Sequence, residues 1–200
     1  RRDGAFVCAL EAQAGQLIAQ RIQTQQNDAL DQIPHYEIQI KNAIYRFVNN
    51  NKILGREQME RLLAAERTGY GQMLLILGIF RQYGYDKSRA EQYLQSKSAV
   101  VRYHTLVCRY EQEHGTWDGL EAMLLDSSRR IRDYAAYILK KHTDSNVIAF
   151  YQKELARNVS AIALYSIGEQ GAKAELNLIR PFLEDERESI CKAALYAYGK

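Results

Sequence analysis

The chain has 200 residues, a mass of 23.0 kDa and a nearly balanced charge, with 27 basic and 24 acidic residues and a net charge of +3. Its 46% hydrophobic and 26% charged residues exclude the collagen-like, mucin-like and intrinsically disordered classes. Only two prolines are present, whereas average usage predicts about ten, and alanine and leucine, both strong helix formers, are abundant. This composition predicts an all-α protein.

The charges and the cysteines indicate which class of partner and which cellular compartment to expect. Basic residues are spread along the chain, so nucleic-acid binding, which depends on clustered Lys and Arg, is the less favoured class of function. No apolar run approaches the ~18 residues that a membrane span needs, and we expect no membrane insertion within this segment. Cys8, Cys108 and Cys191 lie far apart among apolar residues, which favours reduced thiols and a cytoplasmic location. Because the chain opens on Arg1 rather than Met, we expect it to be part of a longer protein.

The first half of the chain predicts a helical cap and two helix pairs. An amphipathic helix with a Gln-rich flank is expected over 5–33, and residues 1–33 would cap the N-terminus. Divergent repeats follow over 34–97. Their helices are expected over 36–48, 56–65, 70–83 and 86–94.

A repeat of about thirty residues is clearer over 98–200. Segments that begin at Val101, Ile131, Val159 and Ile190 share apolar residues on one helical stripe. Each has a small residue four positions later, which would let a neighbouring helix approach closely. Second amphipathic helices are expected over 117–125, 146–157 and 172–183, and the last repeat stops at residue 200 before its second helix. Such helix pairs bury their apolar faces only by stacking on their neighbours.

The segment 126–139 resembles the bacterial type of HEAT-like repeat. It has the pattern of an Asp, five residues, an Arg, paired alanines and a Leu, with Asp126 and Arg132 at the two charged positions. Other copies depart from this pattern at the Asp or at the Arg. The resemblance implies one all-α domain over 1–200, an α-α superhelix built as a right-handed solenoid of about six antiparallel helix pairs. It also implies a binding scaffold with a concave face, and a structural contact of Asp126 and Arg132 between neighbouring repeats.

The chemistry-bearing residues do not form a catalytic pattern. His104 and Cys108 share a helix face at the spacing of two zinc ligands, but no second pair completes a tetrahedral site, so we expect no metal. The Gly-rich segment 69–71 lacks the Lys of a phosphate-binding loop. No nucleophile elbow is present. We therefore expect no enzyme, no cofactor and no small-molecule substrate.

The second helices carry the candidate contacts with a partner. Trp117 would begin one of these helices, either as a packing residue or as an exposed anchor. The other candidates are polar residues of the following two helices. The alternative is that these residues only form the solvent-exposed side of the helices. They are Gln152, Lys153, Arg157, Lys173, Asn177 and Arg180. Their basic surface favours another protein or peptide segment that is moderately polar, with an acidic partner among the alternatives. Two further alternatives stay open, a nucleic-acid-binding helical-repeat module and a regulatory domain of a larger enzyme.

Overall fold

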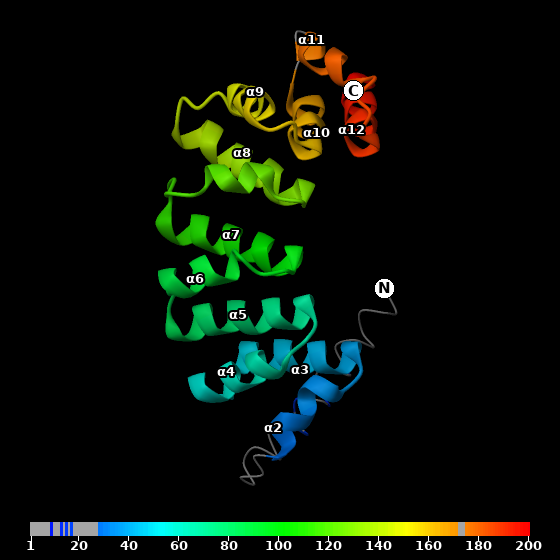
Figure 1. Cartoon of the computed structure of the whole chain (residues 1–200). Coiled ribbons are helices and arrows are strands. Elements are labelled where there is room, and N and C mark those ends of the chain that lie inside the picture. The colour runs from blue at the N-terminus through cyan, green and yellow to red at the C-terminus, as the bar shows by residue number, and fades with distance from the viewer. Residues whose placement is uncertain (1–8, 10–12, 14, 16, 18–27, 172–174) are drawn as a thin grey trace. The chain divides into compact units, whose positions relative to one another are not determined.

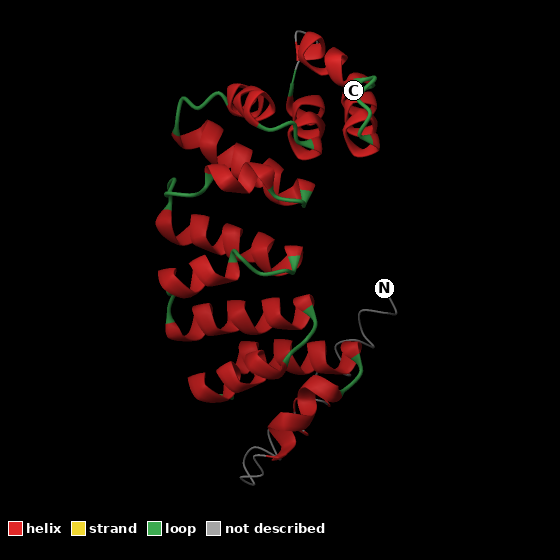
Figure 2. Cartoon of the chain, in the orientation of Figure 1, coloured by secondary structure: helices red, strands yellow, loops and turns green. Residues whose placement is uncertain are grey.

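The computed structural model describes residues 9, 13, 15, 17, 28–171 and 175–200, and all regular structure among them is helical (Figure 2). The all-α class predicted from composition is therefore confirmed. Packing divides the chain into two compact units, residues 1–112 and 113–200. Among the described residues, no helix is both long enough and apolar enough to cross a membrane.

The first unit begins with two short helical segments and continues with longer helices. α2 (Asp28–Gln32) leads into the 3₁₀ turn η1 (Ile33–His35), and most of the capping helix expected over 5–33 lies outside the described residues. The four helices expected over 36–94 are confirmed, with ends that differ by up to three residues. The helices of this unit are α3 (Ile38–Asn51), α4 (Arg56–Ala65), α5 (Gly69–Tyr83), α6 (Lys87–Tyr93) and α7 (Ala99–Glu113).

Helix α5 is the central helix of the first unit. One side of it packs with α3 and α4, through residues such as Tyr45 and Leu75. Its other side packs with α6 and α7 in a second apolar cluster that includes Ile76, Phe80 and Val101. In Figure 1, α5, α6 and α7 accordingly lie side by side as successive layers. A helix with apolar residues around most of its circumference is expected to be covered in this way.

The second unit contains α8 and α10 as its main packing centres. α10 contacts both α9 and α12, and α8 packs on the 3₁₀ turn η2. The small residues expected at close helix contacts, Ala163 and Ala194, are fully buried. The elements of this unit are η2 (Glu121–Leu125), α8 (Arg129–His142), α9 (Val147–Arg157), α10 (Ala161–Gln170), α11 (Leu176–Ile179), η4 (Arg180–Phe182) and α12 (Glu188–Tyr198).

Two of the second helices are shorter than the repeat pattern predicts. The helix expected over 117–125 is replaced by a turn followed by η2, because Gly119 adopts a φ of +90°, which ends helical geometry. The helix expected over 172–183 is described as α11 and η4, and α11 ends two residues before Pro181, which cannot continue an α-helical ladder. The expected helix over 146–157 is confirmed as α9, with the Asn146 side chain as its cap.

The thirty-residue period is visible in the way the first helices of the repeats begin. α5, α7 and α8 begin at Gly69, Ala99 and Arg129. Three residues before each of these starts lies a residue whose side-chain oxygen accepts a hydrogen bond from the main-chain N–H of the residue two positions after it. The same turn precedes α12. Such turns give the backbone a fixed path into the helix. The acceptors are Glu66, Ser96, Asp126 and Asp185, with N···O distances of 2.7, 3.2, 2.7 and 2.9 Å.

Candidate functional site

A groove of about 700 Å³ lies in the second unit, lined by residues 116–122 and Leu125, by the end of α8 and by one side of α9. Helical spacing places Phe150, Glu154 and Arg157 on this side of α9, since they are four and three residues apart. Leu139 of α8 and Leu125 of η2 add apolar surface. The volume lies within the range of about 300–1,000 Å³ that is typical of binding pockets.

Trp117, the sole tryptophan of the chain, is half-buried in the wall of this groove. The prediction that it begins a second helix is wrong, because Trp117 lies in the loop ahead of η2 and a turn covers the three residues that follow it. The loop holds the indole against the groove rather than in a helix–helix core. Half-exposed tryptophans in concave surfaces are frequent anchors of protein–protein contacts.

Four charged residues line the groove: Asp118, Glu121, Glu154 and Arg157. None of these side chains forms an ion pair or a hydrogen bond with another residue that the structure describes. With three carboxylates and one guanidinium, the groove carries a net negative charge. Since the exposed residues of the second helices indicated a basic surface, this charge is the reverse of the one expected from the sequence.

The groove brings together only part of the predicted contact set. Trp117 and Arg157 line it, whereas Lys153 is exposed beside it, about 40° from Arg157 around the helix axis. Gln152 points about 160° away from the groove residue Phe150. The remaining candidates do not line the groove: Asn177 and Arg180 are exposed on α11 and η4, and Lys173 lies outside the described residues.

The groove residues that the sequence prediction missed include the three carboxylates and Phe150. A signal for two of them was present, because Phe150 and Glu154 lie on the same helical face as Arg157 at spacings of seven and three residues. Asp118 and Glu121 had no such signal, since their segment was expected to be one α-helix and instead forms a turn at Asp118 and the start of η2 at Glu121.

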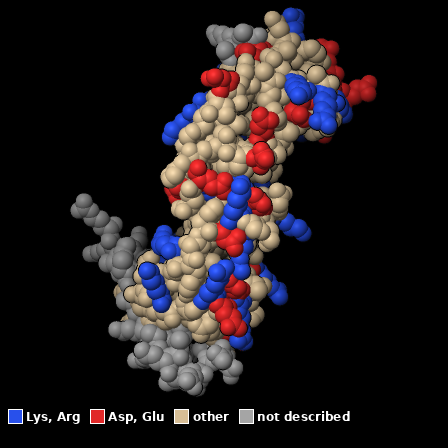
Figure 3. All heavy atoms as spheres, turned by 90° about the vertical axis from the view of Figure 1, so that its left-hand side faces the viewer, with Lys and Arg blue, Asp and Glu red and all other residues tan. Residues whose placement is uncertain are grey.

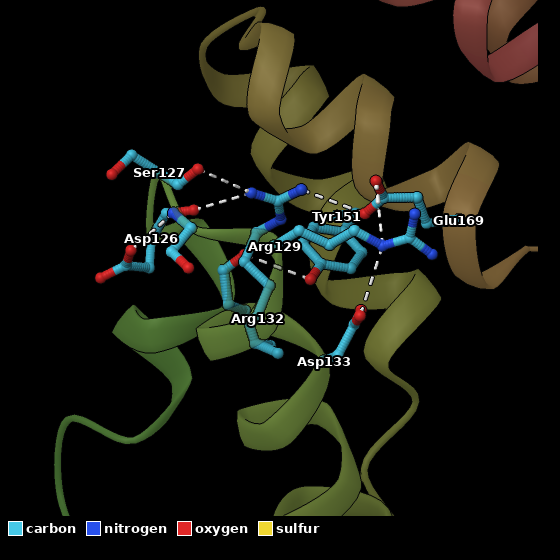
Figure 4. A network of polar contacts seen from close by, with 9 residues as sticks. Asp126, Ser127, Arg129, Arg132, Asp133, Tyr151 and Glu169 are labelled. Carbon is cyan, nitrogen blue, oxygen red and sulfur yellow. Dashed lines mark hydrogen bonds and ion pairs between the residues drawn. The ribbon is translucent and has the colours of Figure 1, made fainter. Parts of the chain in front are cut away.

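Arg132 forms a polar contact that joins the segment ahead of α8 to helix α10 in the second unit (Figure 4). Its Nη1 donates to the main-chain oxygens of Asp126 and Ser127, at 3.0 and 3.3 Å, and its Nη2 lies 3.0 Å from the carboxylate of Glu169 on α10. Arg129 also contacts Glu169, at 3.4 Å. The structural contact predicted for Asp126 and Arg132 thus uses the main-chain oxygen of Asp126, and the cross-repeat partner, Glu169, was missed.

The same arginine position recurs in the repeat before it. Arg102 in α7 donates from Nη1 to the main-chain oxygens of Ser96 and Lys97, at 2.7 and 3.1 Å. One repeat earlier, Gln72 in α5 donates to the main-chain oxygen of Glu66 at 2.8 Å. The contact therefore depends on a long donor six residues after the turn residue, and an Asp at the turn position is not required.

The first unit contains a buried ion pair, Lys41 with Glu66, which stabilises the fold. The Glu66 carboxylate is fully buried and accepts hydrogen bonds at 2.7 Å from Lys41 Nζ, from Tyr45 Oη, and from both the main-chain N–H and the hydroxyl of Thr68. Burial raises the pKa of Glu66, but the hydrogen bonds from Lys41, Thr68 and Tyr45 outweigh it and leave the pKa below its usual value. Burial, reinforced by the carboxylate, raises the pKa of Tyr45. With its acceptor sites occupied, Glu66 is committed to the fold.

The predicted pair His104 and Cys108 lies at a smaller cavity of about 360 Å³ in the first unit. Burial, together with the charge of Glu111, raises the pKa of the Cys108 thiol, which makes it a weak nucleophile. Among the described residues, no three side chains of His, Cys, Asp or Glu are grouped as metal ligands. Within that part of the chain, Cys108 and Cys191 are free thiols, and Cys8 lies outside it.

No protein-family model, no curated protein and no solved structure matches the chain. The resemblance to HEAT-like repeats therefore stays a prediction.

Proposed function

We propose that the chain is a noncatalytic interaction module of HEAT-like helical repeats, which binds a segment of another protein in the groove lined by Trp117, Phe150 and Arg157. The observation that carries this proposal is the grouping of Trp117, Phe150 and Arg157 around one cavity, with charged side chains that have no partner within the described residues. Aromatic and arginine anchors inside a polar rim are the composition of protein–protein hot spots.

The lining of the groove supports a binding role over a catalytic one. Its described residues include hydroxyl groups and carboxylates but no His, Cys or Lys, so the hydroxyl groups have no histidine or lysine base beside them. The Thr143 hydroxyl already donates to the main-chain oxygen of Leu139, at 2.7 Å. Nucleic acid fits poorly, because carboxylates repel phosphates and because basic and acidic side chains are interspersed on the face shown in Figure 3.

The proposal includes the right-handed superhelix of about six helix pairs in one domain, and a cytoplasmic location. The recurring turn ahead of α5, α7, α8 and α12 supports the repeat architecture. Free Cys108 and Cys191 thiols support a reducing compartment.

The proposal is tested by affinity capture with paired variants. The 200-residue chain is used as bait in extract of the source cells, with and without nuclease, and the captured protein is then purified and its Kd for the chain is measured. We expect a Trp117→Ala, Arg157→Ala double variant to weaken this binding by at least about tenfold, because two anchors are truncated.

The matched control removes two exposed polar side chains outside the groove, Asn177→Ala and Arg180→Ala, and should leave the Kd unchanged. Circular dichroism of both variants confirms that helical content is retained. A partner that is lost on nuclease treatment contradicts the proposal. So does a control variant that weakens binding as strongly as the groove variant, because the contact would then lie on α11 and η4.

A further inference from the structure

We propose that the segment bound in this groove is cationic, with lysine or arginine side chains next to an apolar residue. The inference rests on the proposed function and specifies the chemistry of the partner. It follows from the charges around the groove, and it reverses the expectation of an acidic partner that the basic residues of the second helices suggested.

The carboxylates of the groove have no ion-pair partner among the described residues. Asp118, Glu121 and Glu154 line the groove without a cation among the described residues, apart from Arg157 further along the same wall. Elsewhere in this unit some carboxylates are paired, such as Glu169 with Arg132 and Asp185 with Arg187. The exposed Asp144, Glu184 and Glu186 also have no ion-pair partner among the described residues, but they do not line this groove. Unpaired like charges around one concavity attract a partner of the opposite sign.

Helices α8 and α9 both end at the groove. Thr143, the C-cap of α8, and Arg157, the last residue of α9, both line the groove, so the C-terminal ends of both helices adjoin it. Main-chain carbonyls at a helix C-terminus carry partial negative charge and favour a cation nearby. The main-chain carbonyls thus add partial negative charge at the groove, while the basic Lys140, Lys141 and His142 of the last turn of α8 lie outside its lining.

Apolar side chains line the groove between the charged residues. Trp117 and Phe150 are both half-buried and present aromatic surface, and Leu125 and Leu139 extend it. A lysine or arginine side chain combines an aliphatic stem, which packs on such surface, with a charged end that reaches a carboxylate at the rim. The single guanidinium of Arg157 offers a donor for a main-chain carbonyl of the same segment.

The test uses Trp117 fluorescence, since this is the only tryptophan of the chain and it lines the groove. The 200-residue chain is titrated to about 1 mM with three acetylated and amidated peptides, in which two arginines, two glutamines or two glutamates flank a central leucine. We expect the arginine peptide to bind at least about tenfold more tightly than the glutamate peptide. Its binding should weaken as NaCl rises, because exposed charges are screened.

Two double variants separate the groove from the general charge of the protein. Glu121→Gln with Glu154→Gln should weaken binding of the arginine peptide by about fivefold, a modest effect for each of two charge pairs at the protein surface. Glu184→Gln with Glu186→Gln removes the same charge from exposed residues outside the groove and should leave binding unchanged.

Three other outcomes would refute either the cationic partner or the peptide-binding groove. A glutamate peptide that binds as tightly as the arginine peptide refutes the cationic partner and leaves the groove as a binding site. Equal weakening in both double variants also refutes it, because the attraction would then come from the whole protein. An emission of Trp117 that responds to none of the three peptides overturns both the inference and the peptide-binding groove.

Discussion

Replacing Glu169 by leucine removes the carboxylate that Arg132 faces between α8 and α10. Both side chains are almost fully buried, with exposed fractions of 5% and 6%. Breaking a buried ion pair by removing one partner costs about 3–5 kcal/mol, since the other charge stays buried without compensation. Arg132 keeps its hydrogen bonds to two main-chain oxygens, so we expect the lower end, about 3 kcal/mol.

Urea denaturation followed by Trp117 fluorescence measures this loss in the unit that contains the pair. The double variant Arg132→Met, Glu169→Leu should lose less than the sum of the two single variants, with a coupling of at least about 1 kcal/mol. As the control, Glu188→Leu removes an exposed carboxylate from its i,i+4 contact with Lys192 and should cost less than about 1 kcal/mol. A loss below about 1 kcal/mol for Glu169→Leu, or strict additivity, refutes the role assigned to this contact.

Two further predictions concern the first unit and the contact of α10 with α12. Lys41→Met leaves the buried Glu66 carboxylate without its cation and should lower the free energy of unfolding by about 3 kcal/mol, measured by urea denaturation with circular dichroism. Because the folded pKa of Glu66 is lowered, its contribution is fully present above the carboxyl pKa of the unfolded chain and is lost as the pH falls through the folded value, so Glu66→Gln should flatten the acid limb of the stability profile. Gly168→Ala should cost about 1–3 kcal/mol in thermal and urea unfolding, because the new Cβ would lie 2.4 Å from the Cα of Ala197. Gly55→Ala, whose Cβ would have its nearest contact at 3.7 Å, should change stability by less than about 1 kcal/mol, and an equal loss in both glycine variants contradicts the packing argument.

The helices that local signals define were predictable from the sequence. α4 has the expected bounds, Arg56–Ala65, and α9 begins after its Asn146 cap, because apolar periodicity and capping act within a few residues. Gly168 lies inside α10, where the absence of a Cβ lets α12 approach, and this contact depends on the packing of the two helices rather than on a local signal. The backbone of Gly119 likewise depends on the loop in which it lies.

The groove was predictable only in part. Trp117 and Arg157 were identified by residue type and by position on the second elements of the repeats. Asp118 and Glu121, by contrast, belong to a turn and to the start of η2, in a segment that the repeat pattern had represented as one α-helix. Glu169 lies 37 residues from Arg132 in the chain, and a single sequence gives no signal for such a pairing. Long-range polar partners follow from the packing of the helices, which local patterns do not determine.

Hydrogen exchange of the chain, with and without the protein captured from the source cells, tests the binding groove most directly. The account predicts slower exchange on binding over 116–125 and 146–157, the segments that form the groove. It predicts no change around Asn177 and Arg180. Slower exchange confined to α11 and η4, or to the first unit, would contradict the proposed site.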